Sequence, residues 1–215
     1  MGDWSTYHLS DFLLFSERVY RRLFEAHNAA WWPLPVALAV LGAVAIAVLI
    51  GGRARGRSRP RRAAWIGLGT AWLFVAVAFL HARYAPINPP AAPAAGAFAA
   101  QGVALMLYGI LAPHGERPGG WRLALGLFFA LWGLLYPVGA WTRDGAWGAA
   151  EWFGMAPDPT AIVTIGAIVM GVHRRALVAA LLVVPIAWCA LSALTLRAMD
   201  EREMIGAVIG GVPFL

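Results

Sequence analysis

Residues 31–62, WWPLPVALAVLGAVAIAVLIGGRARGRSRPRR, hold an unbroken apolar run that is followed at once by a cluster of arginines. The run from Trp31 to Ile50 has the length, ~17–25 residues, that a helix needs to cross a hydrocarbon core. Its two leading tryptophans suit the aromatic belt at a membrane surface, and the arginines after Gly51-Gly52 suit a cytoplasmic loop. This stretch predicts a membrane-spanning helix and the side on which it ends.

The rest of the chain repeats the pattern of apolar runs and short polar connections. Of its 215 residues, 60% are hydrophobic and 13% are charged, which leaves too little polar surface for a soluble domain. No run alternates with the period of a barrel strand, so each is expected to be a helix. Further spans are predicted over residues 63–80, 92–112, 123–140, 160–172 and 177–196. The fold class is therefore all-α: a polytopic membrane helix bundle with about six transmembrane helices.

The two ends of the chain differ from the spans. Residues 10–28 predict an amphipathic helix, whose apolar face either lies in the membrane interface or packs on the bundle. We divide the chain into an N-terminal interfacial segment, 1–30, and a transmembrane domain, 31–215. After the last span, a charged stretch from Arg197 to Glu203 precedes a short apolar segment.

The distribution of charge predicts an orientation. All 17 basic residues are arginines, and most lie between apolar runs, so membrane orientation explains the basic charge and no nucleic-acid partner is expected. Loops 51–62, 113–122 and 173–175 hold the majority of them, whereas nearly all the acids lie on the other side. The positive-inside rule places these loops in the cytoplasm, and the N-terminus and loop 141–159 outside. The expected partners are the lipid bilayer and either other membrane proteins or a second copy of the chain.

No familiar catalytic motif is present: the chain has no phosphate-binding loop, no dinucleotide fingerprint and no nucleophile elbow. No two histidines share a helix at a spacing of three or four residues, so we predict no catalytic and no metal-binding residues. The single cysteine, Cys189, lies inside an apolar run, where it behaves as a small hydrophobe. The sequence leaves the identity of any cofactor open.

Polar residues gather instead toward the predicted outer side, and they form our candidate ligand-binding site. Gln101 is an amide at membrane depth, where it either bonds to another helix or lines a cavity. The candidate site residues are Asn28, His81, Asn88, Gln101, Glu151, Asp158 and Thr160.

The fifth span is the irregular one. Its apolar run, Thr160 to Val172, is about 20 Å long at helical rise, short for a crossing. We expect Asp158 at its N-cap and Pro159 in its first turn. A short span interrupted by proline is a sequence pointer to a transporter binding site, although a capped helix without further function fits the same residues.

The chain resembles a family of small multi-pass bacterial membrane proteins classed as a domain of unknown function. The resemblance is carried by Phe24, Asn28, Trp32 and Pro33, by Ile87-Asn88-Pro89, by Gln101, and by Gly154, Pro157, Pro159 and Thr160. In relatives the residue between the two prolines can be Cys, whereas here it is Asp158, so a thiol-based metal site does not carry over. The resemblance implies a bacterial inner membrane and no particular activity.

Three functions are compatible with this pattern. The leading hypothesis is a small-solute or ion transporter with an outward-facing site between the second, third and fifth spans, in which Gln101→Leu abolishes uptake. The alternative is a structural or assembly subunit of a larger membrane complex, for which co-purification in mild detergent is the test. The second alternative is a membrane enzyme or cofactor binder using His81 and Glu151, which the absorption spectrum and metal content of the purified protein would reveal.

Overall fold

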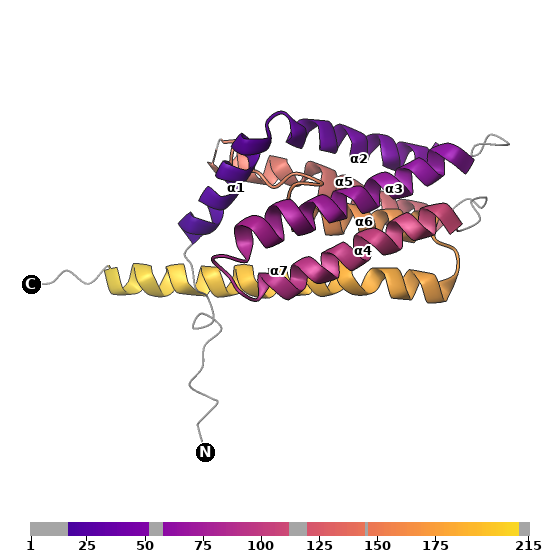
Figure 1. The fold of residues 1–215 in the computed structure, drawn as a ribbon. Helices are drawn as coiled ribbons and strands as arrows, with labels where there is room; N and C mark the ends of the chain where they lie inside the picture. The colour runs from indigo at the N-terminus through magenta and orange to yellow at the C-terminus, as the bar shows by residue number, and fades with distance from the viewer. Residues whose placement is uncertain (1–16, 52–57, 112–119, 145, 211–215) are drawn as a thin grey trace, which may run out of the picture.

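The structure, a computed structural model, describes residues 17–51, 58–111, 120–144 and 146–210. These residues form a bundle of helices that run side by side, with α1 lying at an angle across one end (Figure 1). We call this the α1 end and the opposite end the arginine end. The helices are α1 (Glu17–Trp31), α2 (Leu34–Gly51), α3 (Ser58–Phe74), its π-helical continuation η3 (Val75–Tyr84), α4 (Ala91–Leu111), α5 (Gly120–Asp144), α6 (Pro157–Gly171) and α7 (Arg175–Gly210).

Five of the described helical stretches are long and apolar enough to cross a membrane. They are Leu34–Gly51, Arg59–Tyr84, Ala91–Leu111, Gly120–Gly139 and Arg175–Arg197. Their outer faces carry large apolar side chains, such as Leu41, Leu135 and Val183, which are 60%, 59% and 63% exposed. Apolar faces of this extent are not left open to water in soluble monomers. The prediction of an all-α membrane helix bundle is confirmed.

The short fifth span of the sequence is α6, and it lies inside the bundle. It has 15 residues, about 22 Å at helical rise, and every one of them except Val169 is buried. Its neighbours are α5, α7, α2 and α3. A helix surrounded by protein does not have to match the thickness of the hydrocarbon, because its surroundings are other helices rather than lipid.

Close packing of α6 on α5, and of α3 on α4, depends on glycine. A Cβ atom on Gly166 would lie 2.4 Å from the carbonyl oxygen of Gly126, and one on Gly69 would lie 2.5 Å from that of Gly102. Only a hydrogen in place of a side chain lets the two backbones approach this closely, as in other membrane helix pairs. Two such pairs therefore hold the centre of the bundle together.

Helix α1 packs on the bundle through one face. Phe24 stacks on Phe79 of η3 with ring centroids 4.8 Å apart, and His27 meets the same ring edge-on at 5.3 Å. Of the two surroundings expected for the apolar face of the N-terminal helix, this part contacts the protein itself. Residues 10–16 of the predicted helix lie outside the described residues.

Two helix boundaries predicted at charged residues are wrong. The loop predicted over 51–62 ends early, because α3 begins at Ser58 and so includes the last arginines. One of these, Arg61, is buried, and its Nη1 donates a hydrogen bond of 3.0 Å to the carbonyl oxygen of Leu49. At the other end of the chain, α7 continues without a break through the charged stretch to Gly210. Charge alone did not end a helix in either place.

Candidate functional site

The connection before α6 is fixed by Thr160. The Thr160 hydroxyl accepts a hydrogen bond of 2.8 Å from the Gly154 amide and donates one of 2.6 Å to the Ala156 carbonyl. Gly154 has a φ of +76°, a left-handed conformation that glycine adopts without strain. Thr160 is fully buried, so among the predicted site residues its role is to shape the turn that leads into α6.

Asp158 does not cap α6 as the sequence predicts. The helix begins two residues earlier than that placement requires, with Ala156 at the N-cap and Pro157 in the first helical position. The Asp158 carboxylate instead points to other helices. It accepts hydrogen bonds from Trp188 Nε1 at 2.6 Å, Ser192 Oγ at 2.5 Å and Tyr136 Oη at 3.4 Å.

Asp158 is a buried carboxyl group with hydrogen-bond partners from two other helices. Only 6% of the residue is exposed, and its three donors, from α5 and α7, are all neutral. Hydrogen bonds from several donors stabilise the charged form of a carboxyl group, while burial opposes it. Among the described residues no cation pairs with this carboxylate. Ionisable groups inside a membrane bundle are rare and usually mark a functional site.

Tyrosines and a second carboxylate lie near Asp158. Burial raises the pKa of Tyr20 well above its usual value, and the charges of Glu151 and then Asp158 raise it further. The rings of Tyr20 and Tyr84 have their centroids 5.9 Å apart. Residues from α1, η3, α5, the connection before α6 and α6 itself therefore lie within electrostatic range of one another at the α1 end. We name this group the acidic cluster; it consists of Tyr20, Tyr84, Tyr136, Glu151 and Asp158.

Two predicted site residues support the acidic cluster from its edge. Asn28 Nδ2 donates hydrogen bonds to the carbonyls of Gly148 and Ala150, at 2.7 and 2.8 Å, and so ties α1 to the connection that carries Glu151. The Asn88 side chain, in the turn after η3, is hydrogen-bonded to Tyr84. Asn28 therefore fixes the backbone of the connection, and Asn88 fixes the Tyr84 side chain.

Gln101 lies apart from the acidic cluster. Its Nε2 donates a hydrogen bond of 2.9 Å to the carbonyl oxygen of Leu181 in α7. That carbonyl lacks its partner within the helix because residue 185, four positions later, is a proline without an amide hydrogen. Of the two alternatives for Gln101, the structure shows the interhelical hydrogen bond.

His81 is not brought to the acidic cluster either. It lies in η3 and its side chain is exposed, whereas Asp158 and Tyr84 are buried and the other members of the cluster are half-buried. The buried histidine near this end is His27, which is not among the predicted site residues. Neither of its ring nitrogens has a hydrogen-bond partner among the described residues.

The tyrosines of the acidic cluster and the α7 residues that bind Asp158 were not among the residues predicted from the sequence. Tyr20, Tyr84 and Tyr136 carry no motif, and aromatic residues are ordinary in membrane helices. A weak signal was present in α7, where Trp188 and Ser192 are four residues apart and so share a helix face. Within the part of the chain that the structure describes, no three histidine, cysteine or acidic side chains are grouped as a metal site.

The fold and the acidic cluster together define the class: a polytopic α-helical membrane protein with a buried aspartate, Asp158, inside its bundle. A family model described as a family of unknown function, DUF6064, matches residues 17–213, and the chain belongs to this family. No curated protein matches the chain, and no solved structure matches it.

Proposed function

We propose that the protein is a transporter of a small solute or ion, that its solute carries positive charge, and that the acidic cluster binds it. The observation that carries the proposal is Asp158, a carboxylate buried at the start of a helix in the bundle interior with only neutral donors around it. A buried charge without a counter-charge is costly, so a cation that enters beside it is strongly favoured.

The aromatic residues of the acidic cluster support the same choice of solute. Tyrosine and tryptophan rings attract cations through their faces, and carboxylates supply the opposite charge. Tyr136 and Trp188 both contact the Asp158 carboxylate, and Tyr20 and Tyr84 lie within its electrostatic reach. An anionic solute would meet repulsion from both Asp158 and Glu151, so the anion site that a helix N-terminus offers elsewhere is not proposed here.

The proposed location is a bacterial inner membrane, with the α1 end outside and the arginine end in the cytoplasm. This orientation is supported by the excess of arginine in the loops at the arginine end. It would make the acidic cluster, whose residues come from α1, η3, α5, the connection before α6 and α6, outward-facing. The solute would then be taken up from outside.

The test is uptake by the full chain reconstituted in liposomes, with labelled sodium, rubidium and methylammonium ions as probes. We expect uptake of at least one probe, and we expect Asp158→Asn to reduce it to the background of empty liposomes, because the amide keeps the size of the carboxylate but not its charge. Glu25→Gln, at an exposed position on α1, is the matched control and should transport normally. Failure of all three probes, or normal uptake by Asp158→Asn, would overturn the proposal.

A further inference from the structure

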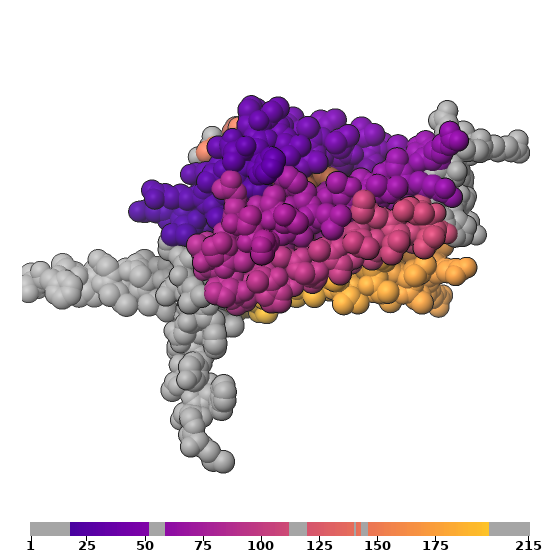
Figure 2. Space-filling view, in the orientation of Figure 1, coloured from indigo at the N-terminus to yellow at the C-terminus, as the bar shows by residue number. Residues whose placement is uncertain are grey.

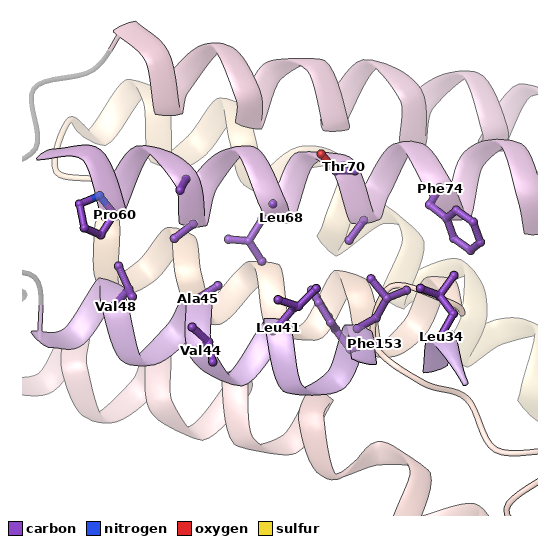
Figure 3. Close-up of a pocket in the computed structure, with 16 residues that line it drawn as sticks. Leu34, Leu41, Val44, Ala45, Val48, Pro60, Leu68, Thr70, Phe74 and Phe153 are labelled. Atoms are coloured by element: carbon purple, nitrogen blue, oxygen red, sulfur yellow. The ribbon is translucent and has the colours of Figure 1, made fainter. Parts of the chain in front are cut away.

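A groove runs between α2 and α3 on the outside of the bundle. Figure 3 shows it from Val48 and Pro60 at the arginine end to Leu34 and Phe74 at the α1 end. It encloses about 550 Å³. Figure 2 views the molecule from the side on which α2, α3 and α4 lie, with α1 at one end and the edge of α7 below α4. Thr70 brings one hydroxyl to the lining, and that hydroxyl already donates to the Ile66 carbonyl at 3.0 Å.

The groove stays open because α3 contributes small side chains to it. Ala63 and Gly67 face α2, and a Cβ added to Gly67 would meet no atom within 4 Å. Gly42 on α2 is different, since a Cβ there would lie 2.6 Å from the ring of Phe153. The Phe153 ring therefore forms the floor of the groove, while no side chain fills the space beside Gly67.

One end of the groove carries unpaired positive charge. Arg59 lies four residues before Ala63 and eight before Gly67, so it projects from the same face of α3 as these two lining residues. Arg59 and Arg62 are exposed, whereas Arg61 is held by the Leu49 carbonyl. Among the described residues no carboxylate pairs with any of these three arginines. The N-terminus of α3, whose dipole also favours anions, lies at the same place.

We propose that the groove binds one acyl chain of an anionic phospholipid, with the lipid phosphate at Arg59 and the first turn of α3. The apolar lining from Pro60 to Phe74 is about 21 Å long at helical rise, which exceeds the ~15 Å of one leaflet of hydrocarbon. A helix of this length and 10–12 Å across would fill roughly 1,600 Å³ or more, so a protein helix would lie on the groove and not in it. A single flexible chain with an anionic head matches both the volume and the charge.

The experiment measures lipid bound to the purified full chain by native mass spectrometry, after equilibration with equal amounts of phosphatidylglycerol and phosphatidylcholine. We expect retained lipid with a preference for phosphatidylglycerol of about tenfold, corresponding to ~1.4 kcal/mol. Gly67→Leu should fill the groove without a backbone clash and remove most of the bound lipid. Gly96→Leu, at an exposed glycine of α4 that also has no atom near its Cβ position, is the matched control and should retain it.

Two more variants separate the acyl chain from the head group. Ala63→Leu fills the groove from a neighbouring exposed position, which covers the case in which Gly67→Leu does not fold. Arg59→Gln with Arg62→Gln should abolish the preference for phosphatidylglycerol and leave some lipid bound. The proposal is overturned if both filled variants keep their lipid, if wild type binds the two lipids equally, or if filling the groove changes the oligomeric state instead.

Discussion

The hydrogen bond from Gln101 to Leu181 replaces one that Pro185 removes from α7. We therefore expect Gln101→Leu to lower stability, because the Leu181 carbonyl is left without a donor, at a cost of about 1–3 kcal/mol. In Pro185→Ala the amide of residue 185 can take the carbonyl itself, so Gln101→Leu should then cost much less. Thermal unfolding of the four members of this double-mutant cycle in detergent measures the difference.

This expectation replaces the one drawn from the sequence, in which Gln101→Leu abolishes uptake and leaves folding intact. If the two substitutions prove additive, Gln101 does not act through the Leu181 carbonyl. If uptake is lost while unfolding is unchanged, Gln101 belongs to the transport pathway after all.

His27 gives the protein a dependence on pH. Burial, and next the charge of Arg83, lower the pKa of His27 from 6.5 to about 4, with a small opposing effect from the Met155 backbone. Above pH 6.5 the imidazole is neutral in folded and unfolded chain alike. As the pH falls from 6.5 to about 4, His27 becomes protonated in the unfolded chain but stays mostly neutral in the folded one. The free energy of unfolding therefore falls by roughly 2–3 kcal/mol.

The measurement is the unfolding temperature of the purified protein between pH 7.5 and about 4. His27→Phe should flatten the dependence and keep the stability at neutral pH, since the ring is fully buried against Phe79 and its nitrogens have no partner among the described residues. A wild-type curve that coincides with the His27→Phe curve would contradict this account.

At the scale of helices, the contact of α5 with α6 is the one most sensitive to size. Gly166→Ala places a Cβ 2.4 Å from the Gly126 carbonyl and 2.7 Å from the Ala130 amide, both backbone atoms that cannot rotate away. We expect a loss of stability of about 1–3 kcal/mol or more from overpacking. Gly139→Ala on α5, where no atom lies within 4 Å of the Cβ position, should leave the unfolding temperature unchanged or raise it. Equal effects of the two substitutions would rule out this close contact.

The long helices could be predicted from the sequence because hydrocarbon selects them by length and apolarity alone. The third predicted span, 92–112, is close to α4, Ala91–Leu111. Two boundaries could not be predicted, since α3 and α7 continue through charged residues that the helix geometry tolerates. The buried position of α6 could not be predicted either, because its short length indicates an irregular span but not that other helices surround it.

The candidate site was predictable only in part, for a physical reason. Gln101 was found because a polar residue in an apolar run is visible in the sequence, and Asp158 was found because it stands between two prolines before a short apolar run. Which polar residues come together depends on how the helices are packed. In this packing Gln101 contacts α7 at Leu181, whereas Asp158 contacts it at Trp188 and Ser192. The tyrosines of the acidic cluster look like any other aromatic residues until the fold brings Asp158 and Glu151 within electrostatic range of them.

For the whole molecule, the proposed orientation can be tested with single cysteines in a Cys189→Ala background. Gly148→Cys lies at an exposed position near the α1 end, and Arg59→Cys lies at the exposed arginine end. A membrane-impermeant maleimide added to intact spheroplasts should label Gly148→Cys, and it should label Arg59→Cys only after permeabilisation. The reverse pattern would place the acidic cluster on the cytoplasmic side.

The enclosure of α6 has a consequence for biosynthesis. As the chain leaves the ribosome, α6 appears before α7, so Asp158 emerges while Trp188 and Ser192 have not yet been made. An aspartate in a membrane helix opposes insertion by ~2.5–3.5 kcal/mol, and a helix of 15 residues is a weak insertion signal. We expect α6 to pack first on α5, through the contact of Gly166 with Gly126, and to be enclosed only when α7 has been synthesised. The centre of the protein would thus be completed last, and a chain interrupted before α7 would expose its carboxylate to quality-control proteases.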